Sequence, residues 1–106
     1  MNIIPGVVGS MGVEHVNDMV RIKITFANSD VRYVETDPQR VKHLWLPALS
    51  ADENDPRKLE TEGSGIKITK KDGLTYVEPT SSIANRQDLQ AIFTKSQVDR
   101  LIKVLL

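Results

Sequence analysis

The two histidines, His15 and His43, are the first candidates for metal ligands or catalytic residues. Glu14 and Asp18 flank His15, but these three side chains would converge only if the segment were helical. A zinc site needs three or four ligands at a defined spacing, and this segment does not supply them. His43 has no evident acidic partner along the chain. We therefore interpret both histidines as surface or partly packed residues and predict no metal site.

The other residue types that could form a catalytic site are absent or are not suitably arranged. The chain has no cysteine, which excludes thiolate metal sites, cysteine nucleophiles and disulfides. Gly6, Gly9 and Gly12 are regularly spaced, but they neither follow a clear strand nor open a clear helix, as a phosphate loop would. The acidic residues of the polar stretch 52–62 lack the rigid, desolvated setting of an acid–base pair. We predict no catalytic residue and no cofactor, and we expect that the chain is not an enzyme.

Basic residues on two predicted hairpins suggest nucleic-acid binding as an alternative function. If the hairpins lie side by side, their basic residues form a strip that contacts phosphates. Two tyrosines at matching positions are candidates for stacking on bases. A net charge of zero argues against a dedicated polyanion binder. The residues of this alternative site are Arg21, Lys23, Arg32, Tyr33, Lys67, Lys70, Lys71 and Tyr76.

Two apolar segments suggest contact with a protein partner. One lies near the N-terminus, where residues 1–19 form either an edge strand of the domain or an arm that docks on a neighbour. The other surrounds the only tryptophan, which either fills the core or anchors an interface. The candidate partner-binding residues are Ile3, Ile4, Val7, Val8, Leu44, Trp45 and Leu46.

Length and composition set the class of protein. A chain of 106 residues with 40% hydrophobic content is predicted to be a single globular domain, 1–106. No apolar stretch approaches the roughly 20 residues that span a bilayer. The first residues lack the basic region of a signal peptide. We expect an intracellular location, in the cytoplasm or within an assembly, and no membrane partner.

The strongest internal pattern is a repeated β-hairpin. Ile22-Lys23-Ile24-Thr25 and Tyr33-Val34-Glu35 recur as Ile66-Lys67-Ile68-Thr69 and Tyr76-Val77-Glu78. Apolar and polar residues alternate in each strand, with the period of a half-buried strand. Asp72-Gly73 is a strong signal for a two-residue turn in the second copy. The repeat predicts matching strand registers, with Lys23 equivalent to Lys67 and Tyr33 to Tyr76.

The remaining elements complete an α+β fold. Asp37-Pro38 predicts the start of a short helix, 38–45, that Pro47 ends. Residues 50–65 are predicted to be a mobile polar loop. Thr94-x-x-Gln97 is a capping box that opens a packed C-terminal helix, 95–106. We expect a small twisted antiparallel sheet or partly open barrel, built from the two hairpins and covered by these helices.

The expected function is an interaction with other proteins rather than catalysis. Absent catalytic groups, edge-prone hairpins and the two apolar segments favour a non-catalytic protein–protein interaction or assembly module. Self-association, or a place in a larger complex, is the expected mode of action. Accessory and virion-type structural proteins are often this small, which is an analogy of size only.

Overall fold

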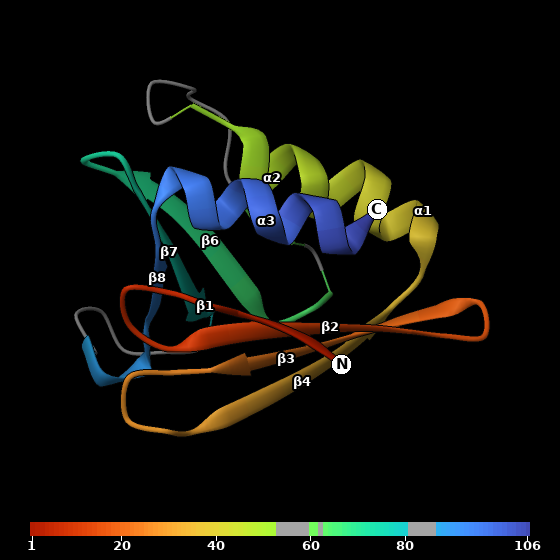
Figure 1. Ribbon diagram of the computed structural model, residues 1–106, viewed down its shortest axis with the longest axis horizontal. Helices are drawn as coiled ribbons and strands as arrows, with labels where there is room; N and C mark the ends of the chain where they lie inside the picture. The colour runs from red at the N-terminus through yellow and green to blue at the C-terminus, as the bar shows by residue number, and fades with distance from the viewer. Residues whose placement is uncertain (53–59, 62, 81–86) are drawn as a thin grey trace.

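The computed structural model describes residues 1–52, 60–61, 63–80 and 87–106. Its secondary structure falls into two four-stranded antiparallel sheets, with strand orders β1-β2-β3-β4 and β5-β6-β7-β8. Figure 1 shows the first sheet on one side of the molecule and two helical segments on the other. The predicted α+β class is confirmed, and the strands do not close into a complete barrel.

The first sheet is a meander of β1 (Asn2–Pro5), β2 (Ser10–Val16), β3 (Met19–Thr25) and β4 (Val31–Thr36). Within residues 1–19, β1 and β2 are therefore paired strands of the chain's own sheet, with β1 at its edge. Directly opposed residues of neighbouring strands lie on the same face of the sheet, and successive residues along a strand alternate between the two faces. The inner face carries two buried rows: Ile4, Met11 and Ile24, then Val13, Ile22 and Val34.

A continuous helical segment follows, formed by α1 (Pro38–Arg40), the π-helical turn η1 (Val41–Trp45) and α2 (Leu46–Ser50). The Asp37 cap is confirmed, because its Oδ1 accepts a hydrogen bond of 2.8 Å from the Arg40 amide. The prediction that Pro47 ends the helix is wrong. The Leu46 amide donates to the carbonyl of Val41, five residues back, which widens the turn just before the proline. Such a turn accommodates a proline ring that would clash in a regular α-helix.

The second sheet contains β5 (Glu60–Thr61), β6 (Ile66–Lys71), β7 (Leu74–Pro79) and β8 (Ala91–Phe93). The predicted turn is confirmed, because Asp72 and Gly73 have φ values of 54° and 77°, as a type I′ turn requires. Strand β5 lies inside the predicted 50–65 loop. Residues 53–59 and 62 of that loop lie outside the described residues. A short 3₁₀ turn, η2 (Gln87–Leu89), precedes β8.

The C-terminal helix α3 (Lys95–Leu105) begins at the predicted capping box. The Thr94 hydroxyl accepts from the Gln97 amide at 3.3 Å, and Gln97 Oε1 accepts from the Thr94 amide at 2.8 Å. Val98, Leu101 and Leu105 form the buried stripe of the helix. This helix contacts α2, β1, β2, β7 and β8, and so covers both sheets.

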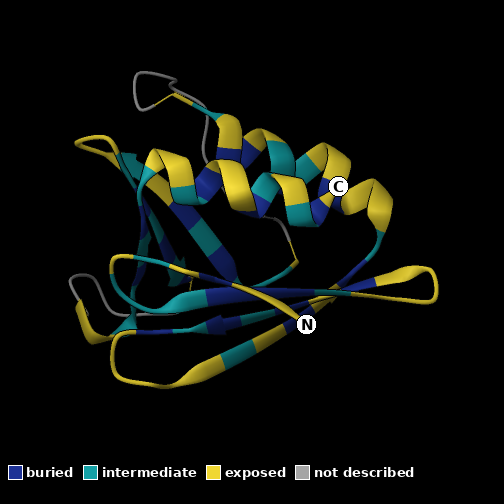
Figure 2. Cartoon of the chain, viewed as in Figure 1, coloured by how far each residue is buried: buried dark blue, intermediate teal, exposed yellow. Residues whose placement is uncertain are grey.

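Backbone hydrogen bonds join the two sheets at one end. The Ile92 amide donates to Val8 at 2.9 Å, and the Val7 amide donates to Ile92 at 2.7 Å. The Ala27 amide likewise donates to Gln90 at 2.9 Å. Buried residues of both sheets and both helical segments form one hydrophobic cluster. Figure 2 shows these buried segments on the sides of the elements that face each other.

The two hairpins are present, but they are not equivalent in register. Val34 is opposite Ile22 in the first hairpin, whereas its counterpart Val77 is opposite Ile68, the counterpart of Ile24. A shift of two residues keeps each side chain on the same type of face, because strand side chains alternate with period two. The predicted match of registers is therefore wrong, while the predicted alternation of apolar and polar faces is correct.

Candidate functional site

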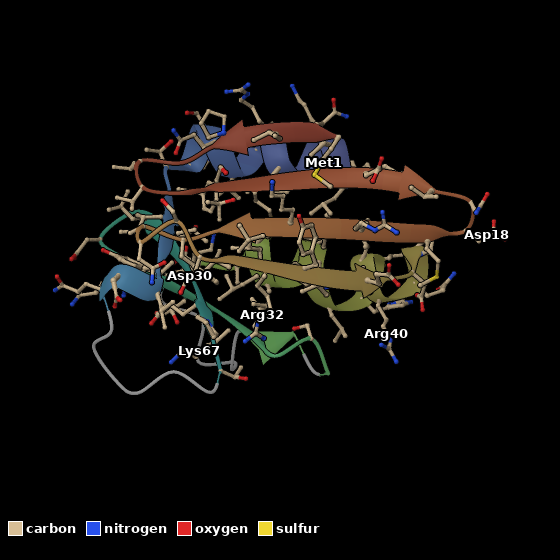
Figure 3. All side chains as sticks on the ribbon, turned by 90° about the horizontal axis from the view of Figure 1, so that it is seen from below. Met1, Asp18, Asp30, Arg32, Arg40 and Lys67 are labelled. Carbon is tan, nitrogen blue, oxygen red and sulfur yellow. The ribbon has the colours of Figure 1, made fainter. Side chains whose placement is uncertain are left out.

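The face of β1–β4 that points away from the helices, here called the outer face, is the first candidate site. Its central row runs across all four strands as Ile3, Gly12, Lys23 and Tyr33. Figure 3 looks onto this face, with Met1 lying over the strands. The two ends of the row are open to solvent, since Ile3 is 56% exposed and Tyr33 is 61% exposed. The row is therefore a polar-centred strip with an accessible apolar residue at each edge.

Exposed apolar side chains gather on this outer face. Among the described residues, eight large hydrophobic side chains are exposed; strand register places five of them on this face, and the close approach of Met1 to Gly12 places a sixth there. In an antiparallel sheet, the face that meets water usually carries polar residues. Strand register places most of the six exposed apolar residues at the edges and ends of the face, around Lys23 and the charged residues of its centre. The six residues are Met1, Ile3, Val16, Met19, Val31 and Tyr33.

Gly12 makes the centre of the outer face flat. A Cβ atom at this position would lie 2.5 Å from the Met1 sulfur, so the methionine side chain rests directly on the glycine backbone. A glycine inside a strand often marks such a close approach. The thioether covers a site that would otherwise expose backbone, and it presents a flexible apolar surface in its place.

Both signs of charge occur in the next row of the same face. Arg21 lies between Glu14 and Glu35 on neighbouring strands. Its guanidinium is 3.6 Å from Glu14 Oε2 and 3.2 Å from Glu35 Oε1. These pairs are solvent-exposed and contribute little to stability. They give the outer face an acidic–basic–acidic pattern rather than a single-signed field.

A cleft of about 490 Å³ forms the second candidate site. It lies between the end of α2, the β6–β7 hairpin and α3, and Leu49, Leu74, Val98 and Ile102 supply its apolar walls. Lys70 enters it half-buried. Burial lowers the pKa of Lys70 below its ordinary value of 10.5, while the nearby Asp99 carboxylate acts in the opposite direction.

The hydrogen bonds of Lys70 favour a structural role in this cleft. Its ammonium donates to the Leu49 carbonyl and to the Thr75 hydroxyl, each at 2.6 Å. A cation at the last carbonyls of a helix satisfies acceptors that lack intrahelical partners. Lys95 and Asp99 at the rim are 3.8 Å apart, so the cleft has no single-signed field to select a charged ligand. We interpret Lys70 as a tie between α2 and the second hairpin.

The predicted partner-binding residues separate into accessible and buried groups. Ile3 and Val7 are exposed, and Val8, Leu44 and Leu46 are intermediate. Ile4 and Trp45 are only 5% and 1% exposed. Of the two alternatives for Trp45, the structure therefore shows the core, and neither Trp45 nor Ile4 is presented to a partner.

The predicted nucleic-acid residues do not form one strip, because the two hairpins belong to different sheets. Arg21, Lys23 and Tyr33 share the outer face. Arg32 lies on the opposite side of β4, where its Nη1 is 3.5 Å from the Gly65 carbonyl, and Lys67 lies nearby on β6 (Figure 3). Tyr76 is flanked by Thr69 and Ile92, Lys70 occupies the cleft, and Lys71 is exposed beside the β6–β7 turn.

Sequence reasoning missed Met1, Val16, Met19 and Val31 as surface residues. A signal for the β1 positions was available, since alternation within Asn2–Pro5 must place Ile3 and Ile4 on opposite faces. Gly12 interrupts the alternation of β2 and so hides the face of Val16, whereas the alternation of β3 already places Met19 on the face opposite to Val20. The sequence prediction gave the whole N-terminal apolar segment one partner-binding role, although successive residues of a strand point to opposite faces.

His15 has a structural partner, whereas His43 is exposed on η1. His15 belongs to strand β2, and its Nε2 is 2.8 Å from the Val104 carbonyl of α3. Within the described part of the chain, no three His, Asp or Glu side chains are grouped as a metal site requires. None of the described helices has the length and apolar character needed to cross a membrane.

Comparisons of the chain with protein-family models, with curated proteins and with solved structures found no match.

Proposed function

We propose that this protein is a non-catalytic assembly module that associates with a second copy of itself through the outer face of β1–β4. The observation that carries this proposal is the concentration of exposed apolar residues on that one face. Burying them against another surface would remove them from water, which is the main favourable contribution to protein association.

The charges of the outer face support a second copy as the occupant. Arg21 lies between Glu14 and Glu35, so the same surface offers both a cation and carboxylates. A symmetric dimer uses one patch twice, and that patch must be complementary to itself. A face with charges of one sign would repel its own copy, whereas this mixed pattern is able to attract it.

Sedimentation equilibrium over micromolar to millimolar concentrations tests the proposal. We expect the wild-type chain to show a concentration-dependent dimer. Tyr33→Asp replaces an apolar contact at the edge of the interface with a charge and should weaken the dimer at least about tenfold, which corresponds to about 1.4 kcal/mol. Tyr33 is exposed, so the fold should persist, and circular dichroism checks this.

Leu106→Asp is the matched control, because Leu106 is also an exposed apolar residue but lies at the end of α3, away from the outer face. This variant should dimerise like the wild type. A wild-type chain that stays monomeric throughout the concentration range, or a Tyr33→Asp variant that dimerises as well as the wild type, would overturn the proposal.

A further inference from the structure

The strand register of the outer face defines how two copies fit together. We infer that two outer faces stack about a two-fold axis that runs along the strands, midway between β2 and β3. Ile3 of each copy then contacts Tyr33 of the other, and Arg21 of each copy meets Glu14 of the other. This inference rests on the proposed self-association and adds its geometry.

A two-fold axis in this position exchanges β2 with β3 and β1 with β4. Each row of the outer face therefore meets the same row of the second copy in reverse order. In the central row, Ile3 lies over Tyr33 at both edges, and Lys23 lies over Gly12 in the middle. The Lys23 stem then rests on the Met1 thioether that covers Gly12.

The charged row matches in the same arrangement. Glu14 and Arg21 are direct neighbours on β2 and β3, so exchanging these strands brings opposite charges together twice. Arg21 already contacts Glu14 of its own chain at 3.6 Å, and it would then bridge carboxylates of both copies. Bidentate donors make a guanidinium suitable for such a bridge.

Other symmetric arrangements bring like charges together or cover less of the face. An axis along β3 places Lys23 opposite Lys23. An axis across the strands, between the two rows, places Lys23 opposite Arg21, its neighbour two residues along β3. An axis between β3 and β4 leaves β1 and β2 uncovered. Juxtaposed like charges disfavour an interface, so the central axis fits this face best.

The size of the face predicts a weak dimer. The four strands contain 4, 7, 7 and 6 residues, and at about 3.4 Å per residue and about 4.8 Å between strands they give a footprint of roughly 390 Å². Standard interfaces bury about 800 Å² on each partner. We therefore expect dissociation in the micromolar range or weaker, which requires a method that captures short-lived dimers.

Thiol cross-linking tests the axis directly, because the wild-type chain has no cysteine. Ile3→Cys and Tyr33→Cys are prepared separately and treated with a short bis-maleimide, alone and as an equal mixture. The mixture should give cross-linked dimers at least about fivefold more efficiently than either variant alone. In a dimer of one variant, the two identical cysteines are three strand spacings apart, about 14 Å along the sheet, so the short reagent joins them less readily.

A charge-exchange pair gives a second, independent measurement. Glu14→Arg and Arg21→Glu each create like-charge contacts in their own dimers, but their mixture restores two opposite-charge contacts. Sedimentation of the mixture should show a heterodimer at least about tenfold tighter than either homodimer. Disturbed contacts within each chain are the same in the mixture and in the separate samples, so they cannot produce this difference.

The outcomes separate the geometry from the proposed function. If the wild-type chain dimerises but Tyr33→Cys alone cross-links as well as the mixture, or the charge-exchange mixture gains nothing, the central axis is wrong and self-association stands. If the wild-type chain does not dimerise at all, the proposed function itself fails.

Discussion

Two buried threonines, Thr36 and Thr75, show how single hydroxyl groups act on this core. Both side chains are almost inaccessible to solvent. The Thr75 hydroxyl accepts a hydrogen bond of 2.6 Å from the Lys70 ammonium. The Thr36 hydroxyl is buried and has no hydrogen-bond partner within the described part of the chain. A buried polar atom without a partner keeps its desolvation cost, whereas a paired atom recovers it.

Replacing each threonine by valine should therefore change stability in opposite directions. Thr36→Val removes an unsatisfied hydroxyl, and we expect the free energy of unfolding to rise by about 1 kcal/mol. Thr75→Val removes the acceptor of a charged donor, and we expect a loss of about 2 kcal/mol. Urea denaturation of both variants measures these changes. A shift of the same sign in both would contradict the hydrogen-bond explanation.

The alternation of side chains along each strand determines which apolar residues belong to the candidate site. The sequence predicted an apolar contact near the N-terminus, and Ile3 does lie on the exposed face while Ile4 lies in the core. Strand periodicity was sufficient to separate these two residues. The burial of Trp45 was not decidable in this way, because it depends on which helix face the distant sheets cover.

At the scale of elements, local signals predicted the parts that local chemistry controls. The Asp72-Gly73 turn and the Thr94 capping box depend on residues within a few positions of each other, and both are present. The helix continues past Pro47 because of a π-helical turn, and no local residue pattern predicts that turn. The sequence repeat also did not predict the strand registers of the two hairpins, because turn length sets register and the two turns differ in length.

The tie that Lys70 makes between α2 and the second hairpin should give stability a measurable pH dependence. Burial lowers the pKa of Lys70 in the folded chain below the ordinary value of 10.5 that it regains on unfolding. Between these two pKa values the unfolded chain binds more protons, so stability rises as pH increases through this window. Below the window, the cost of burying the charge is fully present.

Lys70→Met removes the titrating group, and Lys71→Met is the control because Lys71 is its exposed neighbour. Urea denaturation from neutral pH to about pH 11 should show the stability of the wild type and of Lys71→Met rising relative to Lys70→Met. Equal pH profiles for Lys70→Met and Lys71→Met would show that Lys70 does not carry this dependence.

At the scale of the whole molecule, long-range contacts determine how the two sheets meet. Asp88, Gln90 and Ile92 form backbone hydrogen bonds with the turns of the first sheet, although sixty or more residues separate the partners along the chain. The sequence contains both hairpins in recognisable form but no local signal for the sheet to which each belongs. The basic strip expected from adjacent hairpins fails for this reason.

One continuous core predicts that the two sheets unfold together. Ile24 of β3 and Ile68 of β6 belong to the same buried cluster, which α3 covers from one side. Removing either side chain should weaken both sheets, because cavities in a shared core lower the stability of the whole cooperative unit. We expect Ile24→Ala and Ile68→Ala each to lower the free energy of global unfolding by about 2–5 kcal/mol.

Native-state hydrogen exchange in dilute protein measures this coupling strand by strand. The most protected amides of β3 and β7 should report the same opening free energy, and each alanine variant should lower both values by the same amount. Thr69→Ala, at an exposed strand position, is the control and should lower neither by more than about 0.5 kcal/mol. If Ile24→Ala accelerates exchange in β1–β4 and leaves β7 protected, the sheets open as separate units, and the shared cluster does not couple them.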